Sequence, residues 1–500
     1  MSSIRNTIEF GYDISCPYAY MASRSIEALA NRSGAEIIWK PVLLGALYEA
    51  TGALQGKEGS ASDVFSPTKK GIYMRDFEMS LKRHKVPYRY PDSHPVKTVH
   101  ALRLIYATPN SHRAALTHAL YKAYWSDNFD ISSHSALLEI SRSSTGLQYD
   151  ESTFSHLEYH TALKDATNEA IKRGAFGVPI FWVEHENRFW WGFDRMVMVE
   201  AVCTARSRNV AYHLVTGLSG LHPRCLRVPP VPKQRRRVKL EFWFDFSSPF
   251  AYLGWTQLER MKREAGTGLI VEYKPILLGA LFKMLGGPQL PMDTMSQAKK
   301  RYYFQDMYDW AKHWSAIGSQ QTPPDPLIKF EFPDVFPIKT INSLRIAIAD
   351  NNTIPTICKC HTLVIMVDSI DRAAWGENQN ISDPGILTEV LSKKGFNADE
   401  LLEIANSTRT KEQLRKNTEE AHQLGLCGVP SYRVSDRTKD GWKVNGGITW
   451  GQDRIPVVQD LIAGWHPDRT RLIADVSTSH RLGMIRGGNR GKERKNDYRL

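Results

Sequence analysis

The first forty residues alternate between a strand pattern and a helix pattern. Residues 8–13 ("IEFGYD") carry apolar and aromatic side chains at alternate positions, which favours a β-strand. Residues 25–34 ("SIEALANRSG") have helical spacing and end in Gly34, which predicts a helix closed by that glycine. Residues 36–44 ("EIIWKPVLL") again favour a strand. The chain is therefore predicted to begin strand, helix, strand.

The pattern that follows is mostly helical. Helical spacing runs from about residue 69 to residue 172, and includes "ALTHALYKAYW" and "LKDATNEAIKRG". A strand is predicted at 177–183 ("GVPIFWV"), then a second near 188–192 ("RFWWG"), then a helix from Asp194. A β-α-β start and a β-β-α finish separated by a helical insert are the layout of a thioredoxin-type α/β domain.

The same ordered blocks occur twice along the 500 residues. Each repeated unit is about 200 to 225 residues long, which makes it a whole domain rather than a solenoid repeat. The blocks that match in order are 8–20 with 240–252, 39–53 with 273–287, 69–78 with 299–308, 94–104 with 336–346, 177–181 with 428–432, and 190–196 with 449–455.

The repeat predicts an α/β fold of two tandem thioredoxin-like domains, each with an inserted helical subdomain. The stretch between the copies is rich in Pro and Arg and contains "VPPVP", which favours an extended, semi-rigid spacer. We expect a first domain at 1–204, a linker at 205–237, a second domain at 238–475 and a disordered basic tail at 476–500.

The formal net charge of +12 changes this picture little. Six basic residues lie within 224–237 and six more follow Met484, so the excess is concentrated in the expected linker and tail. Because a nucleic-acid-binding face would place the charge on a folded domain, we expect no nucleic-acid partner.

The apolar pattern also bears on location and on cysteine chemistry. No stretch reaches 18 uninterrupted apolar residues and no signal-peptide core follows the N-terminus, so we expect a soluble, cytoplasmic protein without a membrane partner. A mitochondrial or peroxisomal location stays open.

The six cysteines do not recur at matching places, which argues against a disulfide framework. Cys358-Lys359-Cys360-His361 lacks a second ligand pair at zinc spacing, so no metal is expected.

The two copies of the first strand-to-helix turn differ at one position of chemical interest. The turn reads "SCPY" around Cys16 and "SSPF" around Ser248, and Asp13 and Asp245 precede it. In this layout the turn begins a helix, where amide groups and the helix dipole stabilise an anionic sulfur. For the two aspartates we expect a hydrogen-bonding role rather than proton transfer.

The set of blocks resembles kappa-class glutathione transferases and 2-hydroxychromene-2-carboxylate isomerases, within the DsbA-like branch of thioredoxin folds. The matching residues are Ser248-Pro249, Val429-Pro430 and Gly451-Gln452-Asp453-Arg454 in the second copy, and Cys16-Pro17, Val178-Pro179 and Gly192-Phe193-Asp194-Arg195 in the first. The resemblance implies that the Val-Pro bonds form cis-proline loops and that the Gly-x-Asp-Arg segments hold the γ-glutamyl end of glutathione.

The resemblance implies glutathione as cosubstrate and gives each residue a role. Ser248 and Cys16 are the catalytic candidates. The implied glutathione-binding residues are Lys70, Val178, Pro179, Phe193, Asp194, Lys300, Val429, Pro430, Gln452 and Asp453. Two departures weaken the match. Ala53 and Gly287 stand where family members often have Asn, which puts substrate specificity in doubt. Phe193 and Gln452 stand where the family often has Ser, so a side-chain contact is lost there while backbone contacts remain possible.

Ser248 and Cys16 differ in the chemistry that they allow. Ser248 is expected to donate a hydrogen bond to a glutathione thiolate, and it also suits a helix N-cap. Cys16 is a weaker donor; it is either a thiolate of lowered pKa that exchanges with disulfides, or an inert buried residue. Ala19 takes the fourth place of the C-P-x-C motif, so that motif has no resolving thiol.

The leading functional hypothesis is a kappa-like glutathione transferase that adds glutathione to small, aromatic electrophiles. The alternatives are a glutathione-dependent isomerase acting on an aromatic acid, a monothiol oxidoreductase that uses Cys16, and a non-catalytic tandem interaction module. Since relatives of this kind commonly pair as dimers, the two copies are expected to pack as an intramolecular pseudo-dimer.

Overall fold

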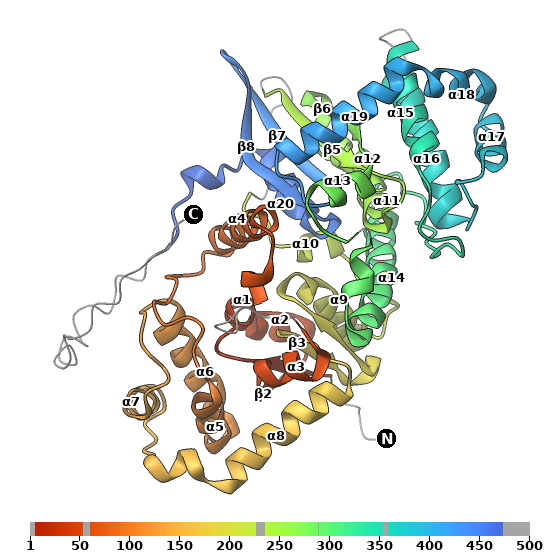
Figure 1. The fold of residues 1–500 in the computed structure, drawn as a ribbon. Coiled ribbons are helices and arrows are strands. Elements are labelled where there is room, and N and C mark those ends of the chain that lie inside the picture. The colour runs from red at the N-terminus through yellow and green to blue at the C-terminus, as the bar shows by residue number, and fades with distance from the viewer. Residues whose placement is uncertain (1–5, 54–60, 227–235, 289, 354–358, 474–500) are drawn as a thin grey trace.

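The computed structural model describes residues 6–53, 61–226, 236–288, 290–353 and 359–473. It contains two four-stranded mixed sheets, one in each half of the chain, as Figure 1 shows. The strand orders are β2-β1-β3-β4 and β6-β5-β7-β8, so the second sheet repeats the topology of the first. In each sheet the first two strands run parallel and the other neighbours run antiparallel.

The first domain follows the predicted order, with the helical insert divided into several helices. Its strands are β1 (Thr7–Tyr12), β2 (Glu36–Pro41), β3 (Ile180–Val183) and β4 (Arg188–Trp191). Its helices are α1 (Pro17–Ser23), α2 (Ile26–Ser33), α3 (Leu44–Thr51), α4 (Pro67–His84), α5 (Val99–Ala107), α6 (Asn110–Trp125), α7 (His134–Thr145), α8 (Leu157–Lys172) and α9 (Met196–Arg208).

The second domain repeats this arrangement with a longer final hairpin. Its strands are β5 (Val238–Phe244), β6 (Leu269–Pro275), β7 (Ser431–Thr438) and β8 (Gly441–Trp450). Its helices are α11 (Pro249–Trp255), α12 (Leu258–Ala265), α13 (Leu278–Met284), α14 (Gln297–Ser319), α15 (Ile341–Thr353), α16 (Lys359–Gly376), α17 (Pro384–Ser392), α18 (Ala398–Asn406), α19 (Thr408–Gln423) and α20 (Ile455–Ala463).

The alternation seen in the first strand decides which face of the sheet meets the core. Ile8, Phe10 and Tyr12 are fully buried, and the Phe10 ring stacks on Tyr12 and Phe181 at centroid distances of 4.9 and 5.5 Å. Glu9 points to the other face, where its partners are Lys40 of β2 and Arg173, the residue after α8. The sheet is thus covered on both sides, and the turn after β1 is held between core and helices.

The segment expected to be an extended linker is instead folded along most of its described length. α9 continues to Arg208, and α10 (Leu218–Leu221) follows within the same segment. The Arg224 Nε atom and the Cys225 N–H donate to the fully buried Asp460 carboxylate, at 2.8 and 3.0 Å. These contacts dock residues 205–226 on the second domain, so the extended spacer was a wrong prediction there. The "VPPVP" segment and the tail from residue 474 lie outside the described residues.

The two domains pack against each other through equivalent elements, along an interface that we call the domain seam (Figure 1). α4 of the first domain reaches β8 and α20: Arg75 Nη1 donates to the Gly446 carbonyl at 2.9 Å, and Arg83 Nη2 lies 2.8 Å from Asp460 Oδ2. α14 of the second domain reaches β4, where the Trp191 N–H donates to Tyr302 Oη at 2.9 Å. The equivalent helices α4 and α14 each contact the sheet of the other domain, as expected for an intramolecular pseudo-dimer.

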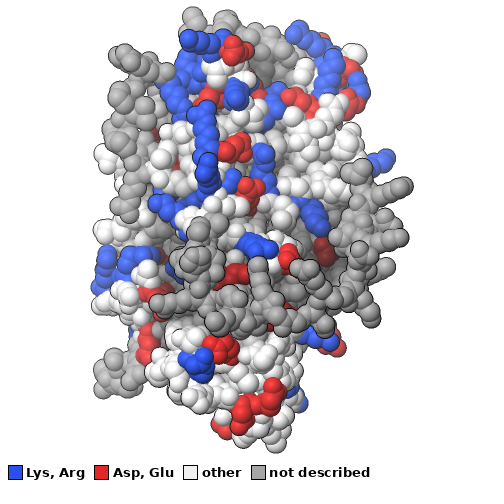
Figure 2. Space-filling view, turned by 90° about the vertical axis from the view of Figure 1, so that its left-hand side faces the viewer, with Lys and Arg blue, Asp and Glu red and all other residues white. Residues whose placement is uncertain are grey.

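The surface in the view of Figure 2 carries basic and acidic side chains interspersed with one another. No helix in the described part of the chain is long and apolar enough to cross a membrane.

Candidate functional site

The turn after the first strand is built in the same way in both domains. The Cys16 N–H donates to the Asp13 carbonyl at 3.1 Å, and the Ser248 N–H donates to the Asp245 carbonyl at 3.1 Å. Burial raises the pKa of both aspartates, which their hydrogen bonds only partly offset. Their carboxylates are buried and accept hydrogen bonds from neighbouring backbone amides, which agrees with a hydrogen-bonding role.

Each aspartate also fixes the helix that follows the second strand. Asp13 Oδ2 accepts from the Leu44 N–H at 2.9 Å, and Asp245 Oδ2 accepts from the Leu278 N–H at 2.7 Å. The first turns of α3 and α13 are thereby tied to the turns that carry Cys16 and Ser248. Two segments thirty residues apart in sequence form one wall of each candidate site.

Residues 16 and 248 have nearly the same backbone conformation and burial, but their side chains bond differently. Both are N-cap residues, and they are 7% and 6% exposed. Ser248 Oγ accepts from the Ala251 N–H at 3.2 Å and donates to the Val429 carbonyl at 3.3 Å. Cys16 Sγ donates to the Val178 carbonyl at 3.4 Å and forms no cap to its helix. The hydroxyl therefore hydrogen-bonds both the helix and the loop, whereas the thiol donates to the loop and does not cap the helix.

The pKa of Cys16 shifts in the direction opposite to the thiolate hypothesis. Burial raises its pKa to about 12, and the weaker opposing effect comes from hydrogen bonds of the Ala19 and Tyr18 amides. At neutral pH the side chain is consequently a protonated thiol. A pKa lowered by the helix start was one of the two alternatives for Cys16, but desolvation of the sulfur dominates at this depth.

The two Val-Pro loops lie directly against these turns, and both peptide bonds are cis. Besides the contacts of Val178 and Val429 just described, each proline carbonyl accepts from the glycine of a Gly-x-Asp-Arg segment. The distances are 3.0 Å from Gly192 N to Pro179 O and 2.9 Å from Gly451 N to Pro430 O. The structure thus joins the three motifs of each domain, the turn, the cis-proline loop and the Gly-x-Asp-Arg segment.

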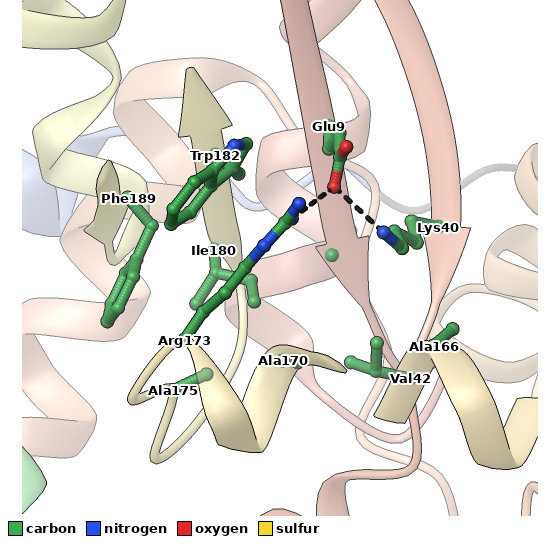
Figure 3. A pocket seen from close by; sticks show the side chains of 11 residues that line it. Glu9, Lys40, Val42, Ala166, Ala170, Arg173, Ala175, Ile180, Trp182 and Phe189 are labelled. Carbon is green, nitrogen blue, oxygen red and sulfur yellow. Dashed lines mark hydrogen bonds and ion pairs between the residues drawn. The ribbon is translucent and has the colours of Figure 1, made fainter. Parts of the chain in front are cut away.

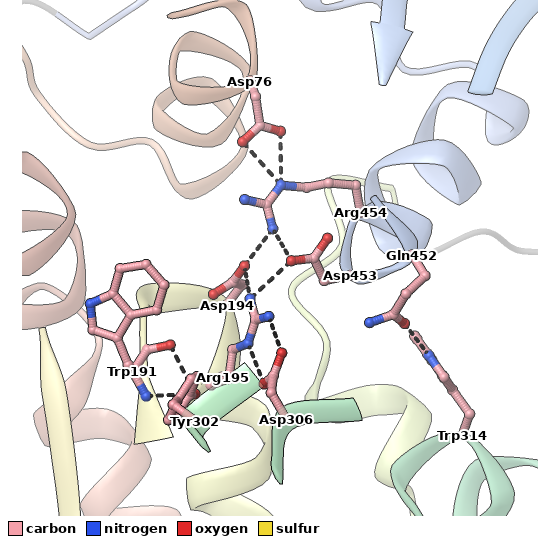
Figure 4. Close-up of polar contacts among 10 residues, drawn as sticks. All are labelled: Asp76, Trp191, Asp194, Arg195, Tyr302, Asp306, Trp314, Gln452, Asp453 and Arg454. Atoms are coloured by element: carbon pink, nitrogen blue, oxygen red, sulfur yellow. Dashed lines mark hydrogen bonds and ion pairs between the residues drawn. The ribbon is translucent and has the colours of Figure 1, made fainter. Parts of the chain in front are cut away.

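The two Gly-x-Asp-Arg segments also meet each other across the domain seam (Figure 4). Arg195 Nη1 lies 2.9 Å from Asp453 Oδ2, and Arg454 Nη1 lies 2.6 Å from Asp194 Oδ2. Each arginine therefore pairs with the aspartate of the other domain. The resemblance gave both aspartates a ligand-binding role, and the pairing between domains was not foreseen.

Two further carboxylates, from the long helices α4 and α14, complete this network (Figure 4). Arg454 Nε lies 2.9 Å from Asp76 Oδ1, and Arg195 Nη2 lies 2.7 Å from Asp306 Oδ2. The sequence carried a signal for them, because Asp76 and Asp306 occupy the same place in matching blocks. Four carboxylates share two guanidinium groups, so this network holds more negative than positive side-chain charge.

This imbalance shows in the two central aspartates. Burial acts against ionisation of Asp194, but Arg195 and Arg454 hold its pKa below the ordinary value. Burial, together with the Asp194 carboxylate, raises the pKa of Asp453 to about 6, although the same two arginines oppose that shift. Asp194 is therefore ionised at neutral pH, whereas the negative charge of Asp453 is only partly neutralised by its arginine neighbours.

The variable residue of each Gly-x-Asp-Arg segment packs on the seam. Gln452 is 1% exposed and its side-chain oxygen accepts from the Trp314 indole N–H. The Phe193 ring lies 4.5 Å from the His84 ring, centroid to centroid. Both side chains are engaged with α4 or α14, so a ligand would meet the backbone of these residues.

The lysines implied as carboxylate ligands have acidic neighbours, and the lysines before them are more enclosed. Lys70 Nζ donates to Asp63 at 3.0 Å, and Lys300 Nζ lies 3.7 Å from Asp293. By contrast, burial lowers the pKa of Lys69 and of Lys299. Lys299 Nζ lies 5.9 Å from the centroid of the Trp191 ring, in the first domain. The sequence gave no reason to prefer these positions, because both lysines of each pair recur in the repeat.

The small cavity in Figure 3 is separate from these motifs. Its volume is about 20 Å³, roughly the space of one water. Glu9 Oε2 beside it accepts from Lys40 Nζ at 2.9 Å and from Arg173 Nη1 at 2.6 Å. Gly11 lines the cavity, while the matching position in the second domain is the fully buried Trp243. The two domains therefore pack differently at this position, and the cavity is too small to hold a tripeptide such as glutathione.

Among the residues that the structure describes, no three His, Cys, Asp or Glu side chains are grouped to hold a metal ion. Residues 358–361 lie outside the part of the chain whose side chains are described.

The fold, the cis-proline loops and the paired turns define a DsbA-like thioredoxin protein with two domains. The family model for the DSBA-like thioredoxin domain matches residues 7–202 and again residues 239–463, and the chain belongs to that family. Both the predicted fold class and the predicted resemblance are confirmed.

The curated relatives are enzymes, each matched almost entirely by about half of this chain. A 2-hydroxychromene-2-carboxylate isomerase of Sphingobium xenophagum is 25% identical over 224 residues, 45% of this chain and 97% of the relative. A glutathione S-transferase kappa 2 of Caenorhabditis elegans is 25% identical over 232 residues, 45% of this chain and 92% of the relative. A solved 2-hydroxychromene-2-carboxylate isomerase, 21% identical, covers 45% of this chain and 94% of its own, with a TM-score of 0.34.

Proposed function

We propose that this protein is a glutathione-dependent enzyme in which the second domain adds glutathione to a small electrophile. The observation that carries the proposal is the convergence of Ser248, the Val429-Pro430 loop and Asp453 at one end of the second sheet. The named relatives, an isomerase and a kappa transferase, support a reaction of this class.

The hydrogen bonds of Ser248 suit it to hold a thiolate. Its oxygen is fixed by the Ala251 N–H, which leaves one proton to donate. In the free protein that proton goes to the Val429 carbonyl over 3.3 Å, a long and weak hydrogen bond. When glutathione binds, the Ser248 hydroxyl would donate its hydrogen bond to the glutathione sulfur instead of to the Val429 carbonyl. That carbonyl would then accept a hydrogen bond from the backbone of glutathione, as in strand-addition binding. The hydroxyl stays neutral while the sulfur carries the charge and attacks the electrophile.

The charge network supplies a place for the other end of glutathione. Asp453 is short of positive charge, and the α-ammonium of a γ-glutamyl group is a cation of suitable size to relieve this. In this proposal Asp453 serves the ligand directly, and Asp194 stays paired with Arg454. The sites are therefore coupled through the seam.

The second candidate is an isomerase that adds glutathione transiently to an aromatic acid and then releases it. It uses the same thiolate, and the relative in Sphingobium xenophagum favours it. Monothiol exchange at Cys16 has less support, because that thiol is buried and protonated at neutral pH. A non-catalytic tandem module would keep the fold but bind no glutathione.

Retention on immobilised glutathione, followed by assays of the full chain, tests the proposal. Ser248→Ala is expected to lower turnover by about 10² to 10³ while changing glutathione affinity much less. Ser392→Ala, at an exposed position in α17, is the matched control and should change neither. Activity on a chlorinated nitrobenzene favours the transferase, and conversion of a chromene carboxylate favours the isomerase. A chain that neither binds glutathione nor catalyses either reaction would refute the proposal.

A further inference from the structure

The surroundings of Cys16 contain hydroxyl groups that the surroundings of Ser248 lack. Alignment of the repeated blocks pairs Tyr18 with Phe250 and Tyr48 with Phe282. The copy that has lost the serine hydroxyl has therefore gained two phenols, and the copy that keeps the serine has plain phenyl rings. This reciprocal exchange suggests that a hydroxyl is needed near the turn but can come from another residue.

Tyr48 is attached to the Cys16 turn through Asp13. The Asp13 carbonyl accepts from Cys16 N, and its carboxylate accepts from Leu44 N, the first residue of α3. Tyr48 lies four residues further along α3, on the same face of the helix as Leu44. After burial, the largest electrostatic contribution that raises the pKa of Tyr48 comes from Cys16, ahead of Tyr73 and Asp13. Tyr48 is partly buried.

Tyr18 and Tyr73 are less suited to serve a ligand. Their rings lie 5.7 Å apart, centroid to centroid, and their hydroxyls hydrogen-bond each other. Both are more deeply buried than Tyr48, and Tyr73 has a tyrosine counterpart, Tyr303, in the second domain. Tyr48 is thus the phenol that is particular to the first domain and adjoins its turn.

We propose that the first domain is a second glutathione site, in which the Tyr48 hydroxyl replaces the serine hydroxyl as the hydrogen-bond donor to the thiolate. The inference rests on the proposed function of the second domain. The glutathione thiol gives its proton to solvent, and Tyr48 donates an O–H···S⁻ hydrogen bond while keeping its own proton. Cys16 keeps its contact with the Val178 carbonyl and forms no bond with the ligand.

The charge states agree with these roles. Burial holds the pKa of Tyr48 well above neutrality, so the phenol remains a donor throughout the physiological range. Burial keeps Cys16 protonated, which avoids repulsion between two anionic sulfurs. A thiol is a weak donor, and a phenol is a strong one, so the stabilising group in this domain is the phenol.

The test uses the full chain with Ser248→Ala, which removes the hydroxyl that stabilises a thiolate at the second site. The ultraviolet absorbance of the thiolate is followed against pH with bound glutathione, and calorimetry gives binding separately. In this background we expect glutathione to bind with a lowered thiol pKa, and the additional Tyr48→Phe change to raise that pKa by about one to two units. Tyr149→Phe removes a phenol from the helical insert of the same domain and should leave the pKa unchanged.

A transplant into the second domain gives the converse measurement. Ser248→Cys alone should raise the pKa of glutathione bound there, and Ser248→Cys with Phe282→Tyr should restore it. Tyr48→Phe is included in both proteins so that the first site does not contribute.

The outcomes separate the two proposals. If the unmodified chain binds no glutathione, both fail. If it binds glutathione but Tyr48→Phe leaves the thiol pKa unchanged in the Ser248→Ala protein, only the Tyr48 inference is overturned.

Discussion

At the scale of single residues, burial rather than position along the helix decides what Cys16 can do. A cysteine at a helix start often has a lowered pKa, and the sequence carried no information on depth. The structure places the sulfur against the Val178 carbonyl with 7% of the residue exposed. Residue type and turn were predictable from the sequence, but the environment of the sulfur depends on the cis-proline loop 162 residues away.

This environment predicts the order in which the cysteines react. Cys225 is only partly buried and burial raises its pKa to about 11, whereas Cys16, Cys203 and Cys427 are buried. In a Cys358→Ser/Cys360→Ser protein, iodoacetamide at neutral pH should label Cys225 before these three. Peptide mass spectrometry over time provides the measurement. Labelling of Cys16 ahead of Cys225 would restore the thiolate hypothesis.

The buried aspartate of the turn predicts a stability effect. Asp245 accepts from the Ser247 and Leu278 amides and from the Thr340 hydroxyl, at 2.9, 2.7 and 2.6 Å. Asp245→Ala leaves these donors without an acceptor and should lower the free energy of unfolding by about 2–4 kcal/mol.

Chemical denaturation measures this difference. Asp440→Ala, an exposed position in the β7–β8 hairpin, is the control and should stay within about 0.5 kcal/mol of the unmodified chain. Equal effects of the two changes would show that the hydrogen bonds of the turn add no stability.

At the scale of elements, the hydrophobic pattern was sufficient where an element has one buried face. The strand at 8–13, the helix ending at Gly34 and the late strand pair were predicted within a few residues of β1, α2, β3 and β4. The interval 69–172 was predicted only as helical, because the breaks between α4 and α8 depend on how those helices pack. α3 was missed, since "EIIWKPVLL" was extended as a strand through Leu44, where the Asp13 hydrogen bond begins the helix.

Gly34 supplies the prediction that belongs to this scale. It ends α2 with a φ of 66°, and a Cβ there would lie 2.9 Å from Ser207 Oγ. Gly34→Ala should lower the free energy of unfolding by about 1–2 kcal/mol because the left-handed conformation is strained with a side chain.

A second glycine provides a control of opposite sign. Gly71 lies inside α4, and a Cβ there would meet nothing within 4 Å. Gly71→Ala should raise the free energy of unfolding by about 0.5–1 kcal/mol. If both substitutions shift the unfolding midpoint in the same direction, the assignment of Gly34 as a left-handed cap is wrong.

At the scale of the whole molecule, the repeat predicted two similar domains but not how they join. Matching blocks show which residues are equivalent, and they do not show which residues of one copy contact the other. The pairing of Arg195 with Asp453 and of Arg454 with Asp194 required the coordinates. We propose a boundary that differs from the sequence-based one, with residues 205–226 belonging to the seam because they dock on Asp460.

The seam network predicts a large cost for removing one arginine. Arg195→Met leaves Asp306 buried without its guanidinium partner and leaves Asp453 with Arg454 alone, and it should lower the free energy of unfolding by about 3–5 kcal/mol. Arg415→Met removes two exposed ion pairs on α19 and should change the free energy of unfolding far less, because exposed ion pairs are screened by solvent. Thermal unfolding of the full chain compares the two. A small effect at Arg195 would mean that the seam is hydrated and that the domains are held together elsewhere.

The same network predicts how stability depends on pH. The pKa of Asp453 rises from 3.8 to about 6 in the folded protein, so the folded state binds this proton more tightly than the unfolded state. Its ionisation therefore opposes folding above pH 6, and the penalty fades as the pH falls from about 6 to about 4. The ionised form of Asp194 stabilises the folded state, because its pKa is lowered there. This stabilisation is lost only when the pH falls below 3.8.

Asp453→Asn isolates this contribution, because the amide cannot ionise. At pH 7 to 8 the variant should exceed the unmodified chain in free energy of unfolding by up to about 3 kcal/mol, the equivalent of a shift from 3.8 to about 6. The difference should shrink steadily toward pH 4, and saturating glutathione should reduce it at pH 7 if the ligand's ammonium group pairs with Asp453. Denaturation curves at several pH values measure it. A difference that stays constant between pH 8 and pH 4 would show that Asp453 is fully paired by Arg195 and Arg454, and that the seam has no negative charge left for a ligand.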